Sequence, residues 1–175
     1  MNHEKSADGS GDGYFLQFLN RTVRMIGREA VDTLRTRRVA IAGCGGVGGA
    51  ACITLARMGV GRFTLADPGL FDEPDINRQW AANGGTLGKN KTAVHEEILH
   101  TINPDVEVRS FSDGVTEENI EAFLDGADLV VDCLDIAVPG HLRSGMSRRA
   151  WERGMYCISA PTLGFGGFVI TASPK

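Results

Sequence analysis

Three glycines that follow a short apolar segment are the residues of this sequence whose spacing most directly suggests chemistry. Gly43, Gly45 and Gly48 fit the pattern G-x-G-x-x-G, and Gly46 lies between them. In this pattern one glycine makes a tight turn, one lets a phosphate approach the backbone, and one lets a helix pack closely on a strand. Exposed N–H groups and the positive end of the following helix then bind an anion. The spacing therefore predicts nucleotide binding, although an ordinary glycine-rich turn can have the same composition.

A carboxylate, Asp67, follows these glycines at about the distance at which an acidic residue bonds a ribose hydroxyl. This spacing fits a dinucleotide and ATP equally, so Asp67 does not separate the two ligands. A surface carboxylate at the end of a strand would look the same. Asp67 is therefore a candidate nucleotide ligand, and other residues must decide which nucleotide it serves.

Two or three cations and a further carboxylate favour ATP. Arg78 lies in a polar loop, Lys89 and Lys91 lie at the start of an expected helix, and Asp132 and Asp135 lie at the end of a buried strand. A hydride-transfer site has no use for such a set beside its phosphates. A site that cleaves a triphosphate uses cations against the charge on phosphorus and an aspartate to hold Mg²⁺. Each residue alone could be an ordinary surface charge, but the ordered set indicates triphosphate chemistry.

Alternating strands and helices are expected to position these residues. Apolar segments predict strands over residues 39–42, 62–66, 106–111, 128–132, 156–160 and 168–171. Helices are expected over residues 50–58, 88–103, 117–124 with Thr116 as N-cap, and 141–153, with one or two more over 14–34. This alternation predicts an α/β fold with a doubly wound, mostly parallel, Rossmann-like sheet and N-terminal helices.

The chain has 175 residues, enough for one domain with its own core. We expect a flexible tail over residues 1–13 and one Rossmann-like domain over 14–175. Because the chain stops directly after an expected strand, a missing C-terminal portion of this domain stays an alternative.

The composition excludes several other classes of protein. A net charge of −4 gives no general reason to expect nucleic acid, although residues 21–38 contain six arginines. The four cysteines form no C-x-x-C pair, so no zinc site is expected. No signal peptide and no membrane-length apolar segment is present, and we expect a cytoplasmic protein without a membrane partner.

Five ordered motifs resemble the ThiF/HesA/MoeB family, the ubiquitin-activating-enzyme-like adenylyltransferases, over residues 21 to about 171. The motifs are Gly43-x-Gly45-Gly46-Val47-Gly48, Asp67, Asn77-Arg78-Gln79, Gly88-Lys89-x-Lys91 followed by Asn103-Pro104, and Asp132-Cys133-x-Asp135. The resemblance implies ATP-dependent activation of a carboxylate through an acyl adenylate, with release of pyrophosphate. The carboxylate is usually the C-terminal glycine of a ubiquitin-like or sulfur-carrier protein, and other carboxylate substrates are alternatives.

The resemblance also implies roles for individual residues, with ATP and Mg²⁺ as cofactors. Arg78 and Lys91 would stabilise phosphate charge, Asp135 would bind Mg²⁺, and Arg21 would reach the ATP of the partner subunit in a homodimer. The nucleotide would be held by Gly43, Gly45, Gly46, Gly48, Asp67, Asp75, Asn77 and Lys91.

The sequence departs from the family pattern at several positions. Gly69 replaces a second acidic residue, Asp75 stands where asparagine is usual, and Ile136 replaces an asparagine after the metal aspartate. The two zinc-binding C-x-x-C pairs of many members and a downstream reactive cysteine are missing, and Cys157 is expected to be buried in a strand.

Three alternatives therefore stay open. The first is a dehydratase of the same family that activates a carboxylate on a modified tRNA base, and the arginine-rich segment favours this alternative. The second is a non-catalytic nucleotide-binding or scaffold subunit. The third and weakest is an NAD-dependent oxidoreductase.

Overall fold

A computed structural model describes residues 11–174 of the chain. Most of the expected tail, residues 1–10, lies outside the described residues, and the remainder belongs to the first helix, α1 (Gly11–Phe18). Two further short helices follow, α2 (Asn20–Ile26) and α3 (Arg28–Thr36). The expectation of one or two helices in this segment is thus corrected to three, because Gly27 adopts a φ of 88° and separates α2 from α3.

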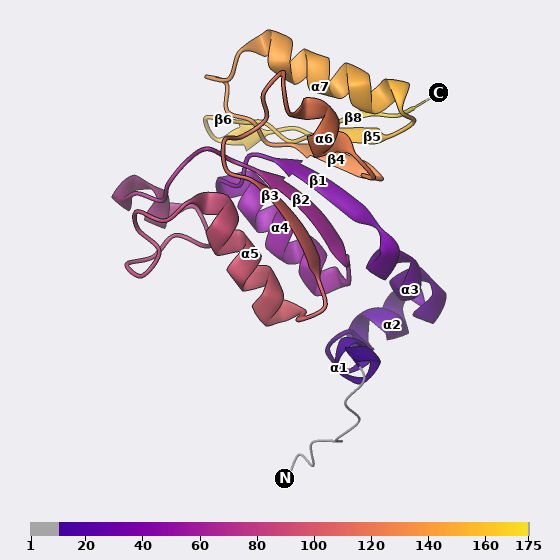
Figure 1. Cartoon of the computed structure of the whole chain (residues 1–175). Helices are drawn as coiled ribbons and strands as arrows, with labels where there is room; N and C mark the ends of the chain where they lie inside the picture. The colour runs from indigo at the N-terminus through magenta and orange to yellow at the C-terminus, as the bar shows by residue number, and fades with distance from the viewer. Residues whose placement is uncertain (1–10, 175) are drawn as a thin grey trace.

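A six-stranded sheet forms the centre of the molecule, with strand order β3-β2-β1-β4-β5-β8 (Figure 1). The first five strands of this order pair in parallel, and β8 is antiparallel to β5. The strands are β1 (Arg38–Ala42), β2 (Arg62–Ala66), β3 (Glu107–Phe111), β4 (Leu129–Asp132), β5 (Tyr156–Ser159) and β8 (Ile170–Ala172). The predicted Rossmann-like, mostly parallel sheet is confirmed.

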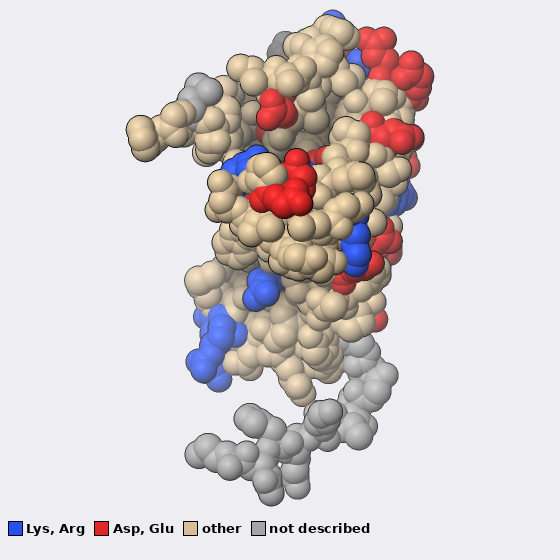
Figure 2. Space-filling model, turned by 90° about the vertical axis from the view of Figure 1, so that its left-hand side faces the viewer, with Lys and Arg blue, Asp and Glu red and all other residues tan. Residues whose placement is uncertain are grey.

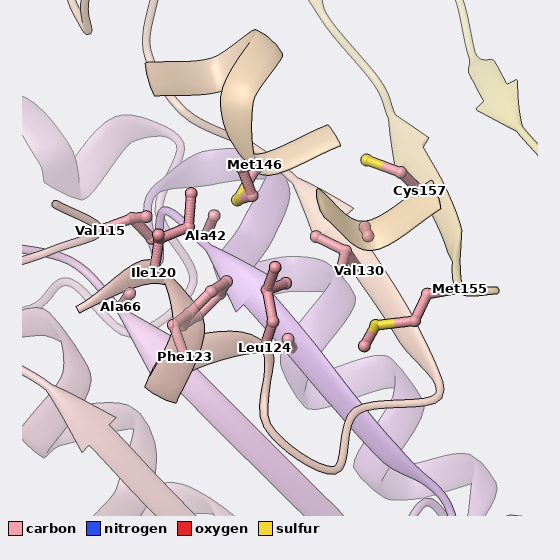
Figure 3. Packing of buried hydrophobic residues seen from close by; sticks show 12 residues of the cluster. Ala42, Ala66, Val115, Ile120, Phe123, Leu124, Val130, Met146, Met155 and Cys157 are labelled. Atoms are coloured by element: carbon pink, nitrogen blue, oxygen red, sulfur yellow. The ribbon is translucent and has the colours of Figure 1, made fainter. Parts of the chain in front are cut away.

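Helices cover both faces of the sheet (Figure 1). One face carries α4 (Gly46–Met58) and α5 (Lys91–Ile102), and the other carries α6 (Ile120–Leu124) and α7 (Gly140–Glu152). Burial on both faces explains why β1 reads as a continuous apolar segment after its first residue. On the second face, Ala42 and Ala66 pack with Phe123, Leu124 and Met146 (Figure 3).

Several boundaries differ from the sequence predictions, and helix α4 begins at Gly46 and not at residue 50 because the glycines of the turn already form its first turn. Helix α5 begins at Lys91 and not at residue 88, because Asn90 caps it by accepting hydrogen bonds from the N–H groups of Thr92 and Ala93. Helix α6 begins only at Ile120, after a turn in which the side chains of Thr116 and Asn119 each accept a hydrogen bond from the other's backbone N–H group. The last strand lies at 170–172, shifted from 168–171, after a small hairpin of β6 (Thr162–Leu163) and β7 (Gly166–Gly167).

Candidate nucleotide site

The parallel register brings the ends of three strands to one place. Ala42 of β1 pairs with Ala66 of β2 on one side and with Asp132 of β4 on the other. The backbone ladder then continues past the strands, since Gly43 N–H donates to the Ala66 carbonyl at 2.8 Å and Cys133 N–H donates to the Ala42 carbonyl at 2.8 Å. The glycine turn therefore lies between Asp67 and the segment that leads to Asp135, at the carboxyl edge where open α/β sheets bind ligands.

The glycines of the turn fall into two groups. Gly43 has a φ of 92°, and a methyl group there would overlap the carbonyl of Cys133; a methyl on Gly48 would overlap the carbonyl of Gly43. These two glycines permit close packing of strand, turn and helix. A methyl on Gly45 or Gly46 would instead meet only Gln79 or Arg78, at 3.7–3.8 Å.

The open side of the turn suits a phosphate group. No side chain caps the first turn of α4, whose N-cap is Gly45, so its N–H groups can serve an anion. A side chain on Gly45 or Gly46 would fill the space between these groups and the loop that carries Arg78. The residues present thus fit the phosphates of a nucleotide.

Asp67 ties the turn to the end of β2. One carboxylate oxygen accepts from Cys44 N–H and the other from Gly69 N–H, both at 2.7 Å. Because each carboxylate oxygen has a second lone pair, the half-buried group can still accept a ribose hydroxyl. The structure therefore gives Asp67 an additional role as a support of the glycine turn.

The two candidate phosphate cations meet at Asp75. This residue lies in the 3-10 helix η1 (Glu73–Asn77) and is 5% exposed. Its carboxylate lies 3.0 Å from Lys91 Nζ and 3.4 Å from the Arg78 guanidinium. Gln79 also donates to it through Nε2. Asn77 is exposed, and its side-chain oxygen accepts from Arg78 at 3.3 Å. The structure thus brings Asp75, Asn77, Arg78 and Lys91 together.

Asp135 lies in the exposed loop between β4 and α7. Its side chain accepts from Ala137 N–H at 2.9 Å, and its carbonyl accepts from Arg143 of α7 at 2.9 Å. Arg143 also donates to the carbonyl of Leu134 and lies 3.5 Å from the buried carboxylate of Asp132. Burial raises the pKa of Asp132, and its hydrogen bond from the Leu134 N–H and the charge of Arg143 oppose that rise. Arg143 therefore orients the loop that presents Asp135.

Arg21 does not approach this site within its own chain. It is exposed on α2, two residues after Leu19, whose side chain packs against Gly59 after the last turn of α4. Because α4 has 13 residues and rises about 1.5 Å for each, the glycine turn lies about 20 Å away, at the other end of α4.

His95 and Arg143 are parts of the site region that sequence reasoning missed. His95 of α5 is 1% exposed, and its Nδ1 lies 2.8 Å from the Lys91 carbonyl. A methyl on Gly49 would approach His95 Nε2 to 2.6 Å, so His95 packs directly under the first turn of α4. Its position four residues after Lys91, on the buried face of the helix, was the available signal. Arg143 gave none, because it meets its partners, two backbone carbonyls and the carboxylate of Asp132, only through the packing of α7 against the end of β4.

The cysteines and the helices add two negative findings. Among the described residues, no group of three or more His, Cys, Asp or Glu side chains could hold a metal ion. Cys157 is 4% exposed in β5, as predicted. Within residues 11–174, no helix is long and apolar enough to cross a membrane.

These features define a Rossmann-like domain whose glycine turn has room for a phosphate group and has two cations nearby. Residues 19–175 match the ThiF family, and the chain belongs to this family. The chain is 40% identical over 121 residues to tRNA threonylcarbamoyladenosine dehydratase of Bacillus subtilis (strain 168), covering 69% of this chain and 48% of that protein. It is 33% identical over 133 residues to molybdopterin-synthase adenylyltransferase of Escherichia coli (strain K12), covering 75% and 52%.

A solved structure shares the fold. The E. coli tRNA N6-threonylcarbamoyladenosine dehydratase TcdA in complex with ATP superposes with a TM-score of 0.76 at 27% identity, covering 85% of this chain and 62% of that one. The chain spans about half the length of these two curated relatives. The domain thus has the adenylyltransferase fold of an enzyme family whose structural neighbour binds ATP.

Proposed function

We propose that this domain uses Mg-ATP to adenylylate a carboxylate. The observation that carries the proposal is the placement of Arg78 and Lys91, joined through Asp75, beside an open glycine turn. A nicotinamide site would need the turn but not the cations. Family membership and the ATP complex of a structural neighbour support the same ligand.

In this reaction a carboxylate oxygen attacks the α-phosphorus of ATP. The bond between that phosphorus and the bridging oxygen to the β-phosphate breaks, pyrophosphate leaves, and an acyl adenylate forms. The N–H groups of the turn would hold phosphate oxygens, and Arg78 and Lys91 would stabilise the charge that develops. Removal of one such donor typically lowers the rate by about 10²–10³-fold.

Asp67 and Asp135 would complete the nucleotide site. Asp67 would bond the ribose with its free lone pairs. Asp135 would hold Mg²⁺, which commonly binds proteins through one or two carboxylates plus the phosphates of the substrate. Its exposed carboxylate on a loop fixed by Arg143 fits this requirement.

The acceptor we favour is the C-terminal glycine of a ubiquitin-like or sulfur-carrier protein, as the family resemblance implies, and the E. coli relative is likewise named for adenylylation of a protein, molybdopterin synthase. A homodimer would bring Arg21, which lies far from the turn of its own chain, to the ATP of the partner subunit. A second candidate acceptor is the carboxylate of a modified tRNA base, favoured by the 40% identity to the B. subtilis dehydratase. Against it, Figure 2 shows acidic and basic groups mixed over the upper and right-hand parts of one face, and basic groups without acidic neighbours only in a small area at its lower left.

Exchange of labelled pyrophosphate into ATP tests the proposal. The protein should catalyse exchange when a partner ending in Gly-Gly is present, and Arg78→Ala and Lys91→Ala should abolish most of it. Retention on tRNA at physiological salt, with exchange dependent on modified tRNA, would select the second acceptor. Tight ATP binding without exchange on either acceptor would refute the enzymatic proposal in favour of a non-catalytic subunit.

A further inference from the structure

We propose that Asp75 is a built-in counter-anion that occupies Lys91 and Arg78 when no nucleotide is bound and thereby sets the affinity of the site for polyphosphate. This inference rests on the proposed function, since it takes these two cations as the phosphate ligands. It replaces the role that the family resemblance implies for Asp75, since a residue expected to hold the nucleotide would instead compete with its phosphates for the two cations.

The geometry around Asp75 supports this role. Its side chain is 7% exposed and that of Lys91 is 13% exposed, so their contact at 3.0 Å is largely shielded from water. Arg78 is 59% exposed and contacts the same carboxylate at 3.4 Å, so it can leave more easily. An ion pair in such surroundings is screened far less than one on the surface.

Asp75 carries its charge at neutral pH. Burial disfavours the charged form, but the hydrogen bonds from Lys91 and the Asp72 backbone, with the charge of Lys91, outweigh burial and hold the pKa of Asp75 below its ordinary value. The three side chains therefore carry a net charge of about +1 rather than the +2 of the two cations alone. A polyphosphate must compete with Asp75 for both of them.

The local packing indicates that Asp75→Asn would keep the fold. The new side chain has nearly the same shape, and its carbonyl oxygen can still accept from Asp72 N–H, as Asp75 does at 3.3 Å. Its amide group would then face Gln79. The Oε1 atom of Gln79 is buried and without a hydrogen-bond partner among the described residues. A 180° rotation of the Gln79 amide would place this oxygen where it accepts a hydrogen bond from the new asparagine amide.

Ligands of graded charge test the proposal on the intact chain. Affinities for inorganic tripolyphosphate, ATP and adenosine would be measured by titration calorimetry for the natural protein and for Asp75→Asn. We expect Asp75→Asn to bind tripolyphosphate and ATP more tightly by about tenfold or more, because a repelling charge near the phosphates is gone. Affinity for adenosine should not change.

Asp72→Asn is the matched control. Asp72 is the N-cap of η1, and its side chain accepts from the N3 backbone in the same capping box that Asp75 completes. Asp72→Asn removes one charge from the same short helix without changing the carboxylate that holds Lys91 and Arg78. It should leave both phosphate affinities within about twofold of the natural protein, because its charge is exposed to solvent.

Several results would overturn the proposal: unchanged or weaker tripolyphosphate binding in Asp75→Asn, an equal gain for adenosine, or an equal gain in Asp72→Asn. If Asp75→Asn does not fold, the carboxyl ¹³C signal of Asp75 in the natural protein decides, since tripolyphosphate should shift it and a constant signal contradicts the proposal. Failure of the proposed function has a different signature, namely bound ATP without pyrophosphate exchange.

Discussion

Alanine substitutions at two glycines of the turn, only two residues apart, should distinguish an effect on folding from an effect on ligand binding. At Gly48 the new methyl would overlap the Gly43 carbonyl and lie 3.1 Å from the Cβ of Cys133. At Gly46 the nearest atoms are the carbonyl and Cγ of Arg78, at 3.7 and 3.8 Å, which is ordinary van der Waals contact. Neither glycine has a positive φ, so space and not backbone conformation decides the outcome.

Gly48→Ala should destabilise the fold. Overpacking typically costs about 1–3 kcal/mol, and here backbone on one side and a strand end on the other leave little room for relaxation, so we expect about 3 kcal/mol. For a chain of 175 residues this corresponds to a fall in Tm of about 6–12 °C. Gly46→Ala should melt at the natural temperature or slightly above it, because alanine favours a helix more than glycine does.

The same two variants should differ in the opposite sense toward the ligand. In Gly46→Ala the methyl fills the space assigned to a phosphate, and ATP affinity should fall by about tenfold or more although the fold is intact. Thermal unfolding followed by circular dichroism, with and without ATP, measures both effects. Equal melting temperatures for Gly48→Ala and the natural protein would refute our reading of the turn, as would unchanged ATP affinity in Gly46→Ala.

Three further predictions concern buried groups around the site. Burial lowers the pKa of His95 in the folded protein. As the pH falls below the pKa of about 6.5 in the unfolded chain, the unfolded chain binds the proton first and the folded protein loses stability. The Tm measured from pH 7 to 5 should therefore decline, and the decline should be smaller in His95→Leu. Arg143→Met should lower the free energy of unfolding in denaturant by about 1–3 kcal/mol, because it leaves Asp132 buried without its cation. Adding Asp132→Asn should recover much of that loss. If the costs of the two substitutions simply add, Arg143 and Asp132 do not interact as an ion pair. Burial raises the pKa of the Cys52 thiol to about 12 and that of Cys44 well above its ordinary value. Iodoacetamide at pH 8 should therefore label neither cysteine in the folded protein and both in denaturant. Rapid labelling of either cysteine in the folded protein would contradict this expectation.

Much of the fold was predictable because several segments carry strong local signals. The predicted strand over residues 62–66 has the same bounds as β2, and β1 begins one residue before the predicted strand over 39–42. These segments are short and mostly apolar, Gly43 follows β1, Gly61 precedes β2, and both strands are buried over most of their length. The start of α5 was misplaced by three residues, since the helix pattern of its apolar residues does not show that Asn90 ends the preceding loop.

The sequence predicts which residues belong to the candidate site, but it does not predict how their side chains contact one another. The spacing of the glycines and the ordered cations identified the residues, and the register of β1, β2 and β4 explains why they converge. The pairing of Asp75 with Lys91 joins η1 to α5 across a loop of irregular structure. Such a contact depends on how that loop closes, which no local pattern encodes.

The position at which ATP is cleaved tests the central claim most directly. The protein would be incubated with Mg-ATP and a partner ending in Gly-Gly, and the phosphorus products would be followed by ³¹P NMR. Attack on the α-phosphorus predicts pyrophosphate together with an acyl adenylate or AMP, and the signals should be lost in Lys91→Ala. Formation of ADP and orthophosphate would contradict the account, because it would show attack at the γ-phosphate.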